Sequence, residues 1–233
     1  MAQLNMNDFA ERSPLATRQG NAPLTLFGNK PFAAHYGATD EVSQLNRCGI
    51  IDLTNLARVG FRGVQTADYL IARGYVLPEA PNTATVQVSG EQVVRLSQTE
   101  YLLLGSIADA GERVAREESS WQLSEQANYL LPRQDSHAWL ALTGEHIAQI
   151  MAKVCGVDLR ASVFAPGDVA QTSIARVNGI VINASTDEIA CFYLLCDRPS
   201  AHYLWGALLD AMQEFEGQPV GINALITALG LAK

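Results

Sequence analysis

The most constraining feature of this sequence is that one order of predicted elements occurs twice between residues 50 and 216. Each half is predicted to contain a strand, a helix, three further strands and a final helix. In the first half, a strand over 50–61 precedes apolar residues at helical spacing that start at Gly63. In the second half, a broken strand over 130–142 precedes a helix that starts at Gly144. We interpret this order as an internal duplication.

The other strands of the two halves are predicted from alternating apolar residues and from turn residues. They are 83–88, 92–96 and 101–104 in the first half, and 170–177, 180–184 and 189–195 in the second. Ser89-Gly90-Glu91 and Asn178-Gly179 are typical hairpin turns between them. The sequence therefore predicts an α+β fold of duplicated β-α-β-β-β-α units, in which each unit packs its helices on one face of an antiparallel sheet.

A helix is predicted to close each half. Ser106 and Asp109 form a capping box for a polar helix over 107–119. Pro199 stands in the first turn of the most regular amphipathic helix in the chain, because a proline needs no amide hydrogen there.

The composition divides the chain into four regions. These are an extended N-terminal arm (1–47), a first α+β subdomain (48–125), a second (126–216) and a C-terminal amphipathic tail (217–233). The arm has no sustained period and cannot offset its ordering entropy alone, so we expect it to stay mobile or to lie along a surface. We also expect its deletion to weaken assembly more than it lowers the melting temperature of the isolated chain. The short helix of the tail docks either on the chain itself or on a partner.

The charge balance excludes several classes of function. The chain has 233 residues, 48% of them hydrophobic, and a net charge of −8, without the clustered basic residues of a nucleic-acid binder. It has no apolar run long enough for a membrane span and no secretion signal, so we expect a cytoplasmic protein. Only three of the 16 basic residues are lysines. Interfaces deplete lysine and favour arginine, so this bias indicates either a surface covered by partners or a bias of the genome.

No motif in the sequence identifies an active site. Nucleophile elbows, phosphate-binding loops and metal-binding helix motifs are all absent from the sequence. The Gly60/Gly63 pair is interpreted as a tight turn, and the similarly placed Asp52 and Asp135 as turn or cap residues. Core or surface roles are expected for the remaining candidates, which are His35, His137, His146, His202, Cys48, Cys155, Cys191, Cys196, Trp121, Trp139 and Trp205. We therefore expect no catalytic, cofactor-binding or metal-ligating residue in this chain.

Several short motifs, taken in order, resemble those of a known family. They are Arg12-Ser13-Pro14-Leu15, Ile51-Asp52-Leu53-Thr54, Val59-Gly60-Phe61-Arg62-Gly63, Ala67-Asp68-Tyr69-Leu70, Leu77-Pro78, Ala80-Pro81-Asn82, Arg95-Leu96, Glu100-Tyr101-Leu102-Leu103, Lys153-Val154-Cys155-Gly156-Val157-Asp158-Leu159, Phe164-Ala165-Pro166-Gly167, Ala170-Gln171-Thr172 and Tyr203-Leu204-Trp205. The chain resembles the gamma subunit of heterotetrameric sarcosine oxidase, in the superfamily of the folate-binding T-protein of glycine cleavage. The resemblance covers about residues 50–215 and part of the arm.

This resemblance implies a fold of two swapped β/α subdomains and a non-catalytic subunit. It implies that larger partner subunits hold FAD, FMN, NAD and tetrahydrofolate, and that the complex oxidises sarcosine or another N-methylated amine. The alternative is a folate-dependent aminomethyltransferase-like or folate-binding protein that acts alone. Such a transferase would have a folate-contacting aspartate in the turn where this chain has Ser89-Gly90-Glu91-Gln92. A regulatory binding module whose partners carry no flavin is a third possibility.

Overall fold

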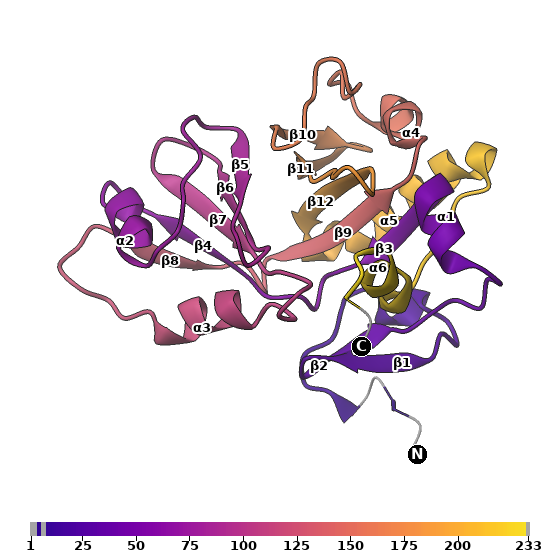
Figure 1. Cartoon of the computed structure of the whole chain (residues 1–233), viewed down its shortest axis with the longest axis horizontal. Helices are drawn as coiled ribbons and strands as arrows, with labels where there is room; N and C mark the ends of the chain where they lie inside the picture. The colour runs from indigo at the N-terminus through magenta and orange to yellow at the C-terminus, as the bar shows by residue number, and fades with distance from the viewer. Residues whose placement is uncertain (1–3, 6–7, 232–233) are drawn as a thin grey trace.

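The computed structural model describes residues 4–5 and 8–231 and contains two main sheets built on the same plan (Figure 1). One has the strand order β5-β6-β7-β4-β8, and the other has the order β10-β11-β12-β9-β3-β13. The strands are β3 (Gly49–Asp52), β4 (Arg58–Arg62), β5 (Thr83–Val86), β6 (Gln92–Arg95), β7 (Glu100–Leu104), β8 (Tyr129–Pro132), β9 (His137–Thr143), β10 (Val169–Ile174), β11 (Val177–Asn183), β12 (Cys191–Asp197) and β13 (Gln218–Pro219). All neighbours pair antiparallel except β13, which runs parallel to β3. The predicted duplication and α+β class are confirmed.

The two sheets exchange strands. The sequence predicts single strands over 50–61 and 130–142, but each of these segments forms two short strands in different sheets. β3 pairs with β9 of the second half, and β8 pairs with β4 of the first half. The chain leaves the first sheet at Pro132, which has no amide hydrogen to donate to a ladder. The predicted boundary between residues 125 and 126 is therefore wrong as a division between the sheets, because each sheet contains a strand from the other half.

Two equivalent glycines make room for the exchanged strands. A Cβ atom on Gly63 would lie 1.9 Å from the carbonyl oxygen of Ala127, just before β8. A Cβ atom on Gly144 would lie 2.3 Å from the carbonyl oxygen of Arg47, just before β3. Both glycines also have positive φ, at 152° and 106°, where other residues are strained. Gly63 and Gly144, which are equivalent positions of the sequence duplication, are thus the two places where the backbone of an exchanged segment approaches the other half of the chain closely.

The apolar residues form three layers around the sheets. The helices are α1 (Glu41–Cys48), α2 (Thr66–Ala72), α3 (Glu112–Ser120), α4 (Ile147–Val154), α5 (Ala201–Met212) and α6 (Ile222–Ala228). α2 and α3 cover the outer face of the five-stranded sheet, while α4 and α5 cover that of the six-stranded sheet. The inner faces of both sheets meet in a third cluster. Successive residues such as Ile50 and Ile51 point into different clusters, as the pleat of a strand requires.

Two predicted boundaries are wrong. Helix α3 begins at Glu112 instead of residue 107, because the Asp109 carboxylate accepts hydrogen bonds from the Gly111 and Arg113 amides, both at 2.9 Å. The β10–β11 turn lies at Ala175 and Arg176, whose φ values are 48° and 67°, instead of at Asn178-Gly179. Gly179 lies within β11, where a Cβ atom would come within 2.8 Å of Ile174 Cδ1.

The prediction that the N-terminal arm is an extended segment is wrong. It contains the β1–β2 hairpin (Leu24–Phe27 and Lys30–Ala33) and α1. Leu15 is fully buried in the cluster under α4 and α5, and Leu45 is fully buried between the sheets. The helix of the tail, α6, packs into that same inner cluster, so the tail docks on the chain itself. No helix in residues 4–5 and 8–231 has the length and apolar character to cross a membrane.

Candidate functional site

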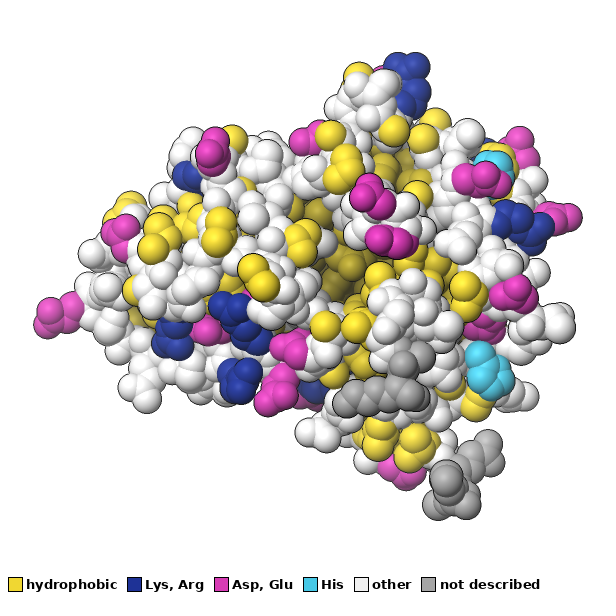
Figure 2. Space-filling model, in the orientation of Figure 1, with side chains coloured by type: hydrophobic (Ala, Val, Ile, Leu, Met, Phe, Trp, Pro, Cys, Tyr) yellow, Lys and Arg dark blue, Asp and Glu magenta, His cyan; other side chains and the backbone are white. Residues whose placement is uncertain are grey.

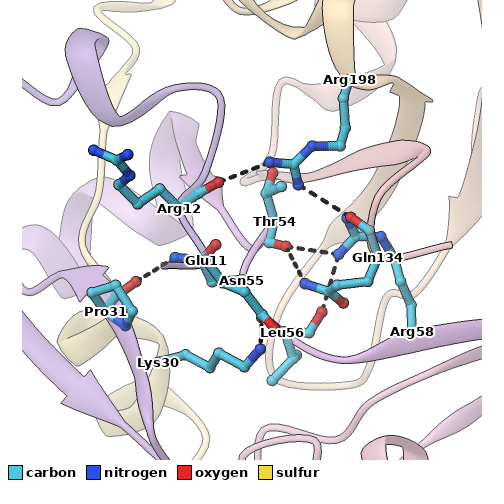
Figure 3. Close-up of polar contacts among 10 residues, drawn as sticks. All are labelled: Glu11, Arg12, Lys30, Pro31, Thr54, Asn55, Leu56, Arg58, Gln134 and Arg198. Carbon is cyan, nitrogen blue, oxygen red and sulfur yellow. Dashed lines mark hydrogen bonds and ion pairs between the residues drawn. The ribbon is translucent and has the colours of Figure 1, made fainter. Parts of the chain in front are cut away.

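The two segments that cross between the sheets meet at one buried arginine. Arg58, the first residue of β4, has no exposed surface, and its guanidinium lies between the two crossovers (Figure 3). Nη1 donates to the carbonyl oxygens of Thr54 at 2.7 Å and Leu56 at 3.0 Å. Nη2 donates to the carbonyl oxygens of Gln134, at 3.2 Å, and His137. Arg58 therefore ties both crossovers through four backbone acceptors.

The charge of Arg58 has no direct carboxylate partner in the described part of the chain. Its Nε is buried without a hydrogen-bond acceptor there. Burial, and next the neighbouring Arg198 guanidinium, lower the pKa of Arg58 to about 9, against the raising effect of more distant carboxylates such as Asp52. A buried cation bonded only to carbonyl dipoles is costly, because those dipoles replace only part of its hydration. The junction is therefore a place where the protein concentrates positive charge.

The N-terminal segment closes this junction from outside. Asp52 is buried at the end of β3, and its carboxylate accepts hydrogen bonds from Ser13 Oγ at 2.5 Å and Gln19 Nε2 at 3.0 Å. Arg198 Nη2 donates to the Arg12 carbonyl oxygen at 2.8 Å, and Nη1 donates to the Gln134 carbonyl oxygen at 3.1 Å. These contacts leave a pocket of about 220 Å³ at the junction, lined by Ala10, Glu11, Arg12, Asn55, Gln134, Asp135 and Arg198.

A larger cleft opens where the two sheets diverge. It has a volume of about 510 Å³, in the range that small-molecule sites occupy. Its lining includes three apolar residues, Leu96, Ile180 and Leu195, and a polar set of Glu100, Arg133, His137, Gln171, Thr172, Ser173, Asn178 and Asp197. The space-filling view shows a hollow with hydrophobic side chains between the part of the molecule built on the five-stranded sheet and the part built on the six-stranded sheet (Figure 2).

The charged groups of the cleft are largely paired with one another. Arg133 Nη2 donates to Glu100 Oε1 at 2.5 Å, and Arg62 lies 3.8 Å from the other carboxylate oxygen. Burial, and next the Arg133 cation, lower the pKa of His137 to about 4, although Asp197 acts in the opposite direction. His137 is therefore a neutral imidazole at pH 7. Its Nδ1 lies 2.8 Å from Ser136 Oγ, a hydroxyl that also donates to the Pro132 carbonyl oxygen at 3.0 Å. The cleft can hold a polar molecule by hydrogen bonds.

The turn between β5 and β6 directs its acidic side chain inward. Glu91 has no exposed surface, and its carboxylate pairs with Arg113 of α3 and accepts a hydrogen bond from Ser89 Oγ at 3.1 Å. This turn is where the resemblance places the folate-contacting aspartate of the transferases. In this chain the Glu91 carboxylate is paired with Arg113 and fully buried, so it is not accessible to a ligand.

The histidines lie apart from one another. His137 lines the cleft, His146 stacks on Phe215 with 4.4 Å between ring centroids, and His35 is exposed. His202 contacts the N-terminal segment, with Nε2 placed 2.6 Å from the Pro14 carbonyl oxygen. Within the described ranges, no three His, Cys, Asp or Glu side chains are grouped to hold a metal ion.

The remaining predicted candidates have structural surroundings. Trp139 and Trp205 are buried, as predicted, whereas Trp121 is half-buried beside α3. Cys191 and Cys196 point into different clusters across β12, and burial raises the pKa of Cys191 to about 12 and that of Cys196 to about 11. Such thiols are protonated at neutral pH and are poor nucleophiles.

Sequence reasoning placed Asp52 correctly and missed the arginines. Asp52 is a capping carboxylate, since it also accepts a hydrogen bond from the Thr54 amide at 3.0 Å, while Asp135 lines the small pocket without a side-chain hydrogen bond in the described chain. Gly60 packs against the exchanged strand, where a Cβ atom would lie 3.1 Å from Leu131 Cβ. Arg58 and Arg198 had no local signal, because two of the four backbone acceptors of Arg58, and both of those of Arg198, come from distant segments. Only the position of Arg58, inside a predicted apolar strand, could have drawn attention to it.

The swapped pair of α+β units defines the class of fold. No family model matches the sequence, and no curated protein matches it either. Solved structures share the fold, including the following two. A chain of the heterotetrameric sarcosine oxidase from Corynebacterium sp. U-96, in complex with pyrrole 2-carboxylate, superposes with a TM-score of 0.64 at 20% identity, over 89% of this chain and 97% of that chain.

The second solved structure is the glycine cleavage system aminomethyltransferase T from Bartonella henselae. It superposes with a TM-score of 0.69 at 13% identity, over 92% of this chain and 61% of the transferase. The chain therefore spans about three fifths of the length of that transferase. At these identities the likeness establishes the fold, which is the one that the motifs predicted.

Proposed function

We propose that this chain is a small, non-catalytic gamma-type subunit of a heteromeric, cytoplasmic sarcosine-oxidase-like flavoenzyme. The complex oxidises sarcosine or another N-methylated amine, and its larger subunits hold FAD, FMN, NAD and the tetrahydrofolate that accepts the one-carbon unit. The observation that carries this proposal is the match in length and fold to a whole chain of a heterotetrameric sarcosine oxidase. The inward, neutralised Glu91 supports it, because a folate site at that turn would need a free carboxylate.

Co-purification from the native source tests this proposal. An affinity-tagged chain at its natural expression level is expected to bring down a larger partner whose absorbance spectrum shows flavin. The purified complex should oxidise sarcosine or a related N-methylated amine. Recovery of the chain as a stable monomer with no flavin-bearing partner would contradict the proposal, and stable partners that carry no flavin would favour a regulatory binding module.

A folate-binding protein that acts alone is the second candidate, and the 510 Å³ cleft favours it. Its hydroxyl and amide groups on Thr172, Ser173 and Asn178 have no protein hydrogen-bond partner among the described residues, so they are available to a polar heterocycle. Calorimetric titration of the isolated chain with tetrahydrofolate separates the two proposals. Saturable heat that the Ser173→Arg variant abolishes would favour folate binding, whereas no heat at millimolar ligand would exclude it.

A further inference from the structure

The pocket at the crossover junction has the chemistry of a site for a small zwitterion. At about 220 Å³ it is smaller than the roughly 300–1,000 Å³ of sites for drug-sized ligands, so it fits a molecule of few heavy atoms. Its lining carries both signs of charge, with two basic side chains, Arg12 and Arg198, and two acidic ones, Glu11 and Asp135. It lies outside the 510 Å³ cleft, with which it shares no lining residue.

The cationic side of the pocket is available to an anion. Arg198 is half-buried, and its guanidinium donates only to the carbonyl oxygens of Arg12 and Gln134 among the described residues. Arg58, fully buried behind it, shares the Gln134 carbonyl oxygen (Figure 3). Two guanidinium groups that meet at one carbonyl repel each other, and a bound carboxylate would relieve that repulsion.

The acceptor side of the pocket is available to an ammonium group. The side-chain oxygen of Gln134, Oε1, is buried with no donor within hydrogen-bond distance, while its Nε2 donates to the Thr54 carbonyl oxygen at 3.1 Å. A buried acceptor without a donor indicates a missing partner. Asp135 is exposed and forms no ion pair within the described residues, whereas Glu11 already pairs with Lys30.

Neither charge alone suits this lining. An anion without a cationic group would lie beside the Asp135 carboxylate, and a cation without an anionic group would lie beside Arg198. We propose that the pocket binds a small α-amino acid, with its carboxylate on Arg198 and its ammonium group on Gln134 Oε1 and Asp135. This site does not depend on the proposed function of the whole chain.

Glycine, acetate and methylammonium are the probes that test this site. We expect saturable chemical-shift changes at the side-chain amides of Asn55 and Gln134 with glycine, and changes at least tenfold weaker at equal concentration with the two singly charged probes. Equal responses to acetate and glycine would show a simple anion site and overturn the proposal. No response to glycine at tens of millimolar would also overturn it.

Two variants locate the charges. Arg198→Gln and Asp135→Asn are each expected to raise the dissociation constant for glycine by about tenfold, the effect of losing one charge-assisted hydrogen bond. Asp135→Asn is isosteric and forms no side-chain hydrogen bond within the described residues, so it should fold normally even if Arg198→Gln does not. Arg160→Gln and Asp187→Asn, on the exposed surface, are the matched controls. Glycine binding that Asp135→Asn leaves unchanged would contradict the assignment.

Discussion

Arg58 is the residue on which both crossovers depend. A single side chain satisfies four backbone carbonyl oxygens that the strand exchange leaves outside the sheet ladders. Buried carbonyl groups without donors cost free energy, so the Arg58 side chain stabilises the fold even though its own charge is poorly compensated. The two crossovers are therefore held together by the hydrogen bonds of a buried cation, and not by apolar packing alone.

Replacement of Arg58 by methionine keeps much of the volume and removes all the donors. We expect Arg58→Met to lower the free energy of unfolding by about 3 kcal/mol, because several buried carbonyl oxygens lose their partners. Urea unfolding measures this change. The control is Arg62→Met at the exposed end of the same strand, where the loss should stay below about 1 kcal/mol. Equal losses in the two variants would contradict the role of Arg58.

His137 predicts an acid-sensitive stability. Burial lowers its pKa in the folded chain to about 4, whereas the ordinary value is 6.5, so the unfolded chain binds the extra proton between these pH values. The free energy of unfolding should therefore fall as the pH decreases from 6.5 to 4, by about 1 kcal/mol after allowance for partial exposure. Unfolding titrations across this range should show a shallower slope for His137→Gln. Substitution of the exposed His35 by glutamine is the matched control, and an equal change of slope in both variants would contradict the role of His137.

The β10–β11 hairpin shows at the element scale how packing decides a turn. Asn-Gly is the stronger local turn signal, yet the chain turns at Ala175 and Arg176 in left-handed backbone conformations. This register pairs Val169 with Ile182, whose side chains both lie in the cluster between the sheets. Burial of the inner face therefore overrides the preference of two turn residues.

The strained turn should accept the residues that such turns favour. We expect the double variant Ala175→Asn/Arg176→Gly to raise the free energy of unfolding by about 1 kcal/mol, since both residues tolerate positive φ. Thermal unfolding followed by circular dichroism measures the change.

Gly179 provides the opposite test of the same register. Gly179→Ala should destabilise the chain by about 2 kcal/mol, because the new Cβ atom would lie 3.0 Å from the Leu195 carbonyl oxygen, which the sheet holds in place. If Gly179→Ala were neutral and the double variant destabilising, the turn would lie at Asn178-Gly179 instead.

At the scale of the whole molecule, the N-terminal segment belongs to the folded body. It places Leu15 in one core cluster, and its Ser13 and Gln19 side chains bond to Asp52 next to the crossover. The expectation that an arm deletion would act mainly on assembly is therefore replaced by an effect on folding. Its removal also takes away Arg12 and the wall of the small pocket.

Deletion of residues 1–23 tests this role. We expect the free energy of unfolding to fall by at least about 3 kcal/mol, from the cavity at Leu15 and from the two donors lost by Asp52. Differential scanning calorimetry of the isolated chain measures the loss. Leu15→Ala alone should reproduce most of it, and a truncated chain with an unchanged melting temperature would show that the segment contributes little.

The sequence by itself determined the duplicated order of elements, the α+β class and the apolar face of the helix that follows Pro199. Periodicity and turn residues carry this information because they act over a few neighbouring residues. They also identified Gly63 and Gly144 as equivalent positions and Asp52 as a structural carboxylate.

Only the tertiary structure decided which half supplies each strand, where the β10–β11 hairpin turns and what meets at the crossovers. A continuous apolar run such as 50–61 is equally suitable for one long strand or for two short ones in different sheets. The choice depends on contacts between residues far apart in the chain, such as Arg58 with Gln134 and His137. The small charged pocket at the junction is likewise assembled from four segments, so no local pattern contains it.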